Sequence, residues 1–181
     1  MDKYSDSYPE VSRENNPQLV MEINQHVDLF YKETYQLVQM PTGNIGIRIR
    51  ISTGAGADSI LIQHEPVVIE ICGENINHCK LYVYPDRKNF PFDYFPHINF
   101  PVTPMQPTLC LTREDFVDWY AEHTFTDYIE LIHKWFKDAN KGNLIKIKDE
   151  DFYEPFRVNS PDGLLLRMPY EDIFIEKLIS H

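Results

Sequence analysis

A run of alternating isoleucines constrains the fold of this chain more than any other feature. Between residues 45 and 52 an isoleucine stands at every second position, and the positions between them hold Gly46, Arg48, Arg50 and Ser52. Side chains of a β-strand point alternately to its two faces, so this period of two predicts a strand with one face in the core and one in water. A glycine-rich loop at residues 54–58 follows it.

Extended segments on both sides of this strand predict a four-stranded antiparallel meander. Residues 35–40 are extended and end at a turn over residues 41–44, whose proline, glycine and asparagine favour a change of direction. Residues 60–72 form the next extended run, with a bulge or edge position at Pro66. The chain turns again at residues 73–75, and residues 80–84 pair back onto the sheet.

Helical patterns flank the predicted sheet. Asn16 as N-cap and Pro17 in the first turn predict a helix that runs to about Lys32 and packs an apolar stripe on the sheet. A short helix is predicted after Thr112. A long amphipathic helix is predicted to follow Thr124 and to stop at residues 140–142. The inward-facing residues expected on this long helix are Phe125, Tyr128, Ile129, Ile132, Phe136 and Ala139.

A proline-rich segment leads into the most chemically informative residue, Cys110. Residues 85–109 hold six prolines, many beside aromatic residues, and such a segment has few backbone donors for a ladder. It is therefore expected to wrap over the sheet as an ordered loop. Cys110 lies in a polar loop after this stretch, where a thiol can be wet enough to ionise and act as a nucleophile. The alternative is a small buried hydrophobic side chain.

Length and composition predict one soluble domain. The chain has 181 residues and is 43% hydrophobic, which suits a single core over residues 16–181, centred on 17–145 with a C-terminal extension over 146–181. Residues 1–15 are expected to form a flexible arm. The net charge of -11 argues against nucleic acid or an anionic membrane as partner. Three cysteines and no signal peptide or membrane span indicate a cytoplasmic protein.

Several other groups of residues can be interpreted either as a functional site or as ordinary structural residues. A metal site at Cys72, His78 and Cys79 lacks the second ligand pair typical of zinc sites, so a hairpin with small buried cysteines is favoured. A Cys-His hydrolase could pair Cys110 with His97 or His123, each 13 residues away. The glycines of residues 54–57 lack the following helix of a P-loop and indicate a turn. The two tryptophans, Trp119 and Trp135, are interpreted as helix-face packing residues.

The order of helix, antiparallel meander, proline-rich wrap, cysteine and helices resembles the ubiquitin-conjugating enzyme (UBC) fold, an α/β fold of the α+β type. The resemblance covers roughly residues 17–145 and is carried by an ordered set of motifs rather than by one. These are Leu81-Tyr82-Val83-Tyr84-Pro85, Phe90-Pro91, Tyr94, Phe95-Pro96-His97-Ile98-Asn99-Phe100, the triplet Leu109-Cys110-Leu111, Trp119 and the helix from Thr124 to Phe136. The chain is most similar to prokaryotic members, and among these to the stand-alone conjugating-enzyme-like protein of short type II CBASS anti-phage operons.

This resemblance implies an activity and a partner. Cys110 would be the nucleophile that forms a thioester with the C-terminus of a cGAS-like nucleotidyltransferase (CD-NTase) and passes it to an amine such as a lysine. The operons of this type encode no separate activating enzyme. The resemblance implies no metal and no nucleotide cofactor for the protein itself.

The chain departs from the family pattern at the position that supports the oxyanion. Eukaryotic members carry His-Pro-Asn shortly before the cysteine, and residues 102–109 contain no such motif. His97 and Asn99 lie earlier, so a Thr108 hydroxyl or backbone amides are the expected oxyanion donors. His97 is expected to shape the site or act as acid or base. Glu114, Asp115 or His123 is expected to orient the incoming amine.

Two alternative functions remain open from the sequence. The missing asparagine favours a non-catalytic binding module in which Cys110 is structural and the surface holds a partner. A second alternative is a conjugating enzyme for a ubiquitin-like protein that receives its cargo from a separate activating enzyme.

Overall fold

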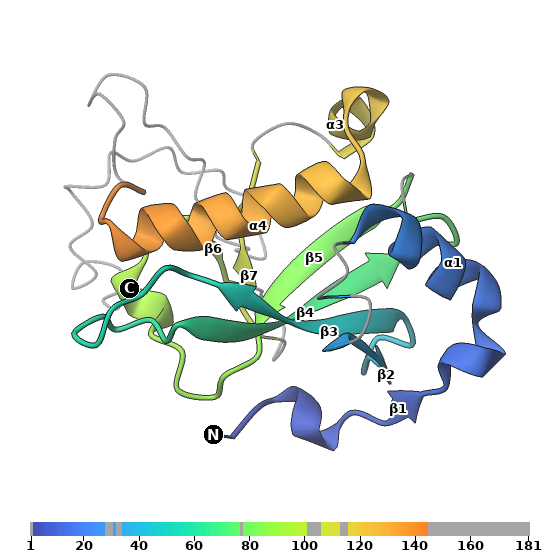
Figure 1. Cartoon of the computed structure of the whole chain (residues 1–181), viewed down its shortest axis with the longest axis horizontal. Coiled ribbons are helices and arrows are strands. Elements are labelled where there is room, and N and C mark those ends of the chain that lie inside the picture. Colours follow the sequence, from blue (N-terminus) through green and yellow to red (C-terminus); the bar gives the residue numbers. More distant parts are fainter. Residues whose placement is uncertain are drawn as a thin grey trace, which may run out of the picture. The chain divides into compact units, whose positions relative to one another are not determined.

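The structure, a computed structural model, describes residues 2–27, 31, 34–76, 78–100, 106–112 and 116–144 (Figure 1). The chain divides into two compact units, Met1–Leu144 and Ile145–His181, and all of the described residues belong to the first. The predicted C-terminal extension lies outside the described residues. None of the helices described is long and apolar enough to cross a membrane.

A five-stranded antiparallel sheet with its strands in sequence order forms the centre of the first unit. The strands are β1 (Glu10–Val11), β2 (Gln36–Gln39), β3 (Ile45–Ser52), β4 (His64–Cys72) and β5 (Lys80–Pro85). The predicted meander is therefore present as β2 to β5, and β1 adds a fifth strand where the sequence predicts four. β4 begins at His64 rather than at residue 60, and Pro66 lies inside it, opposite Arg50.

The isoleucine face of β3 lies in the main hydrophobic core, as the alternation predicts. Ile47 is paired with Ile69 of β4, and Ile49 with Val67, so apolar side chains form continuous rows across the sheet. The helices α1 (Pro17–His26) and α4 (Phe125–Asn140) contribute to the same core (Figure 1). A shorter helix, α3 (Phe116–Glu122), precedes α4.

The long helix α4 has the start, the stop and the buried face that the sequence predicts. A reciprocal capping box joins Thr124 and Asp127, because the Asp127 carboxylate accepts from the Thr124 amide at 2.7 Å. Gly142, with a φ of 65°, follows its C-terminus. The buried residues of α4 are Phe125, Tyr128, Ile129, Ile132, Trp135, Phe136 and Ala139.

The first helix ends earlier than the sequence predicts. α1 stops at His26, short of the predicted end at Lys32, because Val27 adopts extended backbone. Residues 28–30 lie outside the described residues. Asn16 precedes the helix as expected, but its side-chain amide donates to the Ser12 carbonyl at 3.1 Å and makes no cap with the first turn.

The N-terminal residues, for which the sequence predicts a flexible arm, lie along the sheet. β1 pairs with β2, and the Tyr4 amide donates to the Asp86 carbonyl at 2.8 Å. The Ser5 amide donates to the Asp86 carboxylate at 2.7 Å. The strand pairing and the Tyr4 contact are made by backbone groups, which carry no periodic side-chain pattern, so hydrophobic periodicity gives no sign of them.

This N-terminal segment gives the sheet a second, smaller apolar cluster on the face opposite the main core. Val38, Met40, Val68 and Tyr84 are buried there, with Tyr8 packed against them. β3 adapts to this cover at Gly46, where an added Cβ would lie 2.7 Å from Val68 Cγ1 and 2.8 Å from Met40 Sδ. The prediction of one core face and one wet face therefore holds only for part of β3.

A buried ion pair holds the start of the proline-rich segment to the sheet. Arg87 donates from Nη2 to Glu65 Oε1 at 2.7 Å and from Nε to Oε2 at 3.1 Å. Its Nη1 donates to the Asn89 carbonyl at 3.2 Å. The side chains of Glu65 and Arg87 are 0% and 7% exposed. The segment then forms the 3-10 turn η3 (Phe92–Tyr94) and the two-residue strands β6 (Ile98–Asn99) and β7 (Thr108–Leu109).

Removal of one partner of this pair is expected to destabilise the fold strongly. Arg87→Met leaves the Glu65 carboxylate buried without its cation, which typically costs about 3–5 kcal/mol in the free energy of unfolding. Urea denaturation followed by tryptophan fluorescence measures the change. Lys88→Met, at the exposed neighbouring position, is the matched control and is expected to stay within about 0.5 kcal/mol of the parent. Equal stability of the two variants would contradict a structural role for the ion pair.

Candidate active site

Cys110 is positioned by a short antiparallel pair built from the proline-rich segment. In this pair Ile98 lies opposite Leu109 and Asn99 opposite Thr108. The Cys110 amide then donates to the His97 carbonyl at 2.9 Å, which continues the pairing by one position. The fold therefore sets His97 beside Cys110, and His97 is one of the two histidines that the sequence offered as neighbours of this thiol.

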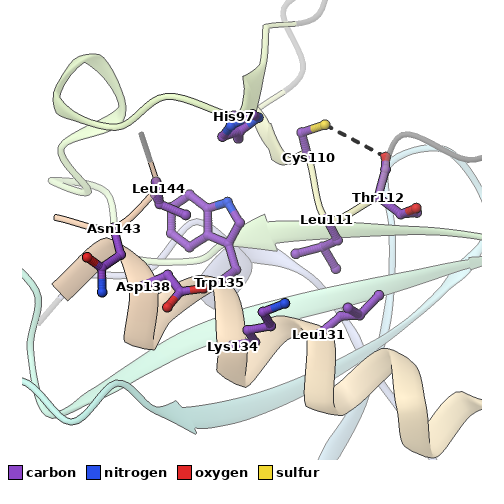
Figure 2. Close-up of a pocket in the computed structure, with 10 residues that line it drawn as sticks. All are labelled: His97, Cys110, Leu111, Thr112, Leu131, Lys134, Trp135, Asp138, Asn143 and Leu144. Carbon is purple, nitrogen blue, oxygen red and sulfur yellow. Dashed lines mark hydrogen bonds between the residues drawn. The ribbon is translucent and has the colours of Figure 1, made fainter. Parts of the chain in front are cut away.

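Cys110 lines a pocket between this strand pair and α4, with its sulfur turned toward Thr112 (Figure 2). The pocket has a volume of about 220 Å³, and Cys110 is partly exposed. Its Sγ lies 3.9 Å from the Thr112 carbonyl oxygen. The residues that line the pocket are His97, Cys110, Leu111, Thr112, Leu131, Lys134, Trp135, Asp138, Asn143 and Leu144. A thiol in this position can be reached from outside, unlike the buried hydrophobic side chain considered from the sequence.

His97 combines a pocket-lining side chain with an uncommon backbone conformation. Its φ of 59° is in the left-handed region, which residues with a Cβ rarely adopt. The residue lies between η3 and β6, where the chain turns so that its carbonyl meets the Cys110 amide. The half-buried imidazole then forms part of the pocket wall.

Asn99 and Thr108 contact each other. The Asn99 side-chain amide donates to the Thr108 hydroxyl oxygen at 3.4 Å, and Thr108 is buried. Neither residue lines the pocket that contains Cys110. The Cys110 amide is itself committed to the His97 carbonyl. The Cys110 amide, one of the oxyanion donors expected from the sequence, is therefore engaged in the strand pair, and the Thr108 hydroxyl, which accepts from Asn99, is buried away from the pocket lining.

His123, the other histidine predicted for the site, has a local structural environment. Its ring stacks on Trp119 with centroids 4.5 Å apart and an interplanar angle of 11°. Its Nδ1 lies 2.9 Å from the Trp119 carbonyl oxygen, and it is not part of the pocket lining. The acidic residues 114–115, predicted to orient an amine, lie outside the described residues.

The helix α4 supplies pocket residues that sequence reasoning missed. Lys134, Trp135 and Asp138 form one wall, with Leu131 one turn earlier. Their spacing of three and four residues places them on one side of the helix, at the border of its apolar face. That spacing can be read from the sequence, but it does not show that the segment with Cys110 lies against this side of the helix.

The two other cysteines are poorly suited to thiolate chemistry. Burial, and then the nearby Glu70 carboxylate, raise the pKa of Cys72 to about 11. Burial, and then Cys72 itself, raise the pKa of Cys79 to about 11. Both thiols therefore stay protonated at neutral pH. In the part of the chain that the structure describes, no three His, Cys, Asp or Glu side chains are grouped to hold a metal ion.

The family comparison covers the part of the chain that contains this pocket. The family model described as prokaryotic E2 family A matches residues 80–172, more than half of the chain, from the first residue of β5 past the end of α4. The chain belongs to this family. Cys110 and the whole lining of its pocket lie within the matched region. The family indicates a conjugating-enzyme-like role of the transferase type, and no curated protein or solved structure matches the chain.

Alkylation is expected to distinguish the three thiols. In the Cys110→Ala variant, labelling by iodoacetamide should be slow at pH 7 and rise about tenfold per pH unit up to pH 9.5, because only the thiolate reacts and both remaining thiols have a pKa of about 11. In the parent chain, Cys110 should be labelled first. Intact mass and peptide mapping follow the reaction. Labelling of Cys72 before Cys110 would contradict this assignment.

At residue 97 a glycine variant is expected to be more stable than an alanine variant, which is the reverse of the usual order. His97→Gly should be more stable than His97→Ala by about 1 kcal/mol, because the left-handed conformation costs a residue with a Cβ about 1–2 kcal/mol and glycine nothing comparable. Both substitutions remove the same imidazole, so the difference between their free energies of unfolding reports the cost of the backbone conformation at residue 97. Thermal or urea unfolding measures it. An alanine variant as stable as the glycine variant would show that φ is not held positive.

Proposed function

We propose that this protein is a ubiquitin-conjugating-enzyme-like acyltransferase that carries an acyl group as a thioester on Cys110 and transfers it to an amine. The observation that carries the proposal is a partly exposed thiol on a pocket at the exit of β7, inside the region matched by the family model. The other two thiols have a raised pKa and are unsuited to the step. A thioester stays reactive towards amines, which suits a thiol as carrier.

The proposed chemistry has two steps. A carboxyl end arrives already activated, as a thioester on another protein or as an acyl adenylate. The Cys110 thiolate attacks its carbonyl carbon, so that a new C–S bond forms while the bond to the departing thiolate or AMP breaks. An amine then attacks the same carbon and loses a proton to solvent or a nearby base. The C–S bond breaks, and the Cys110 thiolate is released.

We further propose that the acyl donor is the C-terminus of a cGAS-like nucleotidyltransferase in a bacterial anti-phage (CBASS) operon, and that the acceptor is a lysine. The motifs around residues 81–85, 90–100 and 109–111 support this narrower proposal through their resemblance to the stand-alone proteins of those operons. Transfer would regulate the nucleotidyltransferase. His97 would shape the pocket around the thioester, since its carbonyl orients Cys110 and its ring lines the wall.

Intact mass of the protein co-expressed with its operon neighbours tests the proposal. The parent chain should carry an adduct of one nucleotidyltransferase chain that a thiol reductant removes. Cys110→Ser should carry an ester adduct that resists the reductant and yields to hydroxide, because an oxyester is less reactive than a thioester. Cys110→Ala should carry no adduct, and Cys72→Ser should behave as the parent.

The alternatives give different results in the same experiment. A binding module would co-purify with its partner without any covalent adduct, and Cys110→Ala would leave the partner's function unchanged. A conjugating enzyme for a ubiquitin-like protein would form its adduct only when an activating enzyme and that protein are supplied.

A further inference from the structure

Trp135 has a buried polar group that packing does not explain. The side chain is 5% exposed and makes edge contacts with Phe95 and Phe136, at centroid distances of 5.6 Å and 5.2 Å. Its indole nitrogen is buried and, among the described residues, has no hydrogen-bond partner. Buried indole N–H groups usually find an acceptor, and leaving one unpaired costs about 1–3 kcal/mol.

This unpaired donor lies in the wall of the Cys110 pocket. Trp135 and Cys110 line the pocket from opposite elements, α4 and the exit of β7. In Figure 2 the nitrogen-bearing edge of the indole is turned toward His97 and Cys110, while the six-membered ring points to the other side. The folded protein already bears the desolvation cost of this donor, so an acceptor that comes within reach of it from the pocket adds a hydrogen bond without further desolvation of the indole.

The second tryptophan of the chain lacks this arrangement. Trp119 is equally buried, at 5% exposed, but it lies on α3, stacks on His123 and does not line the pocket. Burial on a helix is common to both tryptophans, but only Trp135 lines the pocket, and it is Trp135 whose indole nitrogen is buried without a partner among the described residues. The pair also provides a matched control, since the two residues can be changed in the same way.

We propose that the Trp135 indole N–H donates a hydrogen bond to a carbonyl oxygen of the acyl group carried on Cys110, and so positions that group in the pocket. The inference rests on the proposed function. The carbonyl is an acceptor that a thioester at Cys110 must bring to the site. The Cys110 amide donates to the His97 carbonyl, and the Thr108 hydroxyl is buried outside the pocket lining, so a donor from α4 supplies what these two groups do not.

Acylation of Cys110 with a small thioester tests this assignment without the natural donor. The probe is the N-acetylglycine thioester of 2-mercaptoethanesulfonate, whose carbonyl is attacked by Cys110 as 2-mercaptoethanesulfonate departs. The chain has two tryptophans, so a ¹H–¹⁵N spectrum of the full chain shows two indole resonances, and Trp119→Phe identifies that of Trp135. We expect the Trp135 indole proton to move downfield on acylation. In Cys110→Ala the same reagent should leave it in place.

Acylation rates give a second, independent measurement. Trp135→Phe removes the N–H and keeps an aromatic ring, and it should slow acylation of Cys110 about 2- to 10-fold, as expected for one neutral hydrogen bond. Replacement of Trp135 by benzothienylalanine, which exchanges only N–H for sulfur, should slow it equally. Trp119→Phe should acylate at the parent rate.

The results separate this inference from the function on which it rests. If Cys110 becomes fully acylated while the Trp135 resonance stays in place, or if the benzothienylalanine protein acylates at the parent rate, Trp135 is only a packing residue and the proposed function stands. If Cys110 takes no acyl group while free cysteine in the same buffer does, the proposed function fails, and this inference fails with it. The resonance is measured on the parent chain, so a poorly folded variant does not affect it.

Discussion

The short pairing of β6 with β7 is the constraint on which the rest of the site depends. It consists of two residue pairs, extended by the hydrogen bond from the Cys110 amide to the His97 carbonyl at 2.9 Å. Pro96, Pro101 and Pro107 lie within two residues of this pair and have no backbone N–H to extend the ladder. The few remaining bonds therefore fix where the thiol lies, and β7 itself packs beside β5 of the main sheet.

The helix α4 couples this site to the hydrophobic core. Its buried face packs with the sheet residues, while Lys134, Trp135 and Asp138 at the border of that face form the pocket wall. The capping box at Thr124 and Asp127 fixes where the helix starts, and so which residues reach the pocket. A shift of α4 on the sheet would move core and pocket together, which makes the geometry around Cys110 a consequence of core packing.

The regular part of this fold could be predicted from the sequence because it depends on side-chain periodicity. The alternation of β3 and the apolar stripe of α4 extend over enough residues to be recognised, and both were predicted correctly. β1, β6 and β7 have two residues each, which is too short for any period. They are held by backbone hydrogen bonds that most residue types can make, so their position emerges only from the tertiary fold.

The same distinction applies to the site. Cys110 stood out from its position between a proline-rich segment and a helix, and His97 was a candidate neighbour, but the geometry that brings His97 and Trp135 to the pocket could not be predicted. His97 reaches it through strand register and a left-handed backbone, and Trp135 through the crossing of α4 beneath the loop. Neither relation is encoded in local spacing.

This arrangement also bears on the absence of a His-Pro-Asn motif in the chain. The Cys110 amide holds the loop by donating to the His97 carbonyl, and the Thr108 hydroxyl is buried and does not line the pocket. A hydrogen bond cannot at once hold the loop and serve an incoming carbonyl without loss of one role. The donor that we propose for the substrate carbonyl therefore comes from another element, α4, whose Trp135 N–H is buried in the wall of the same pocket.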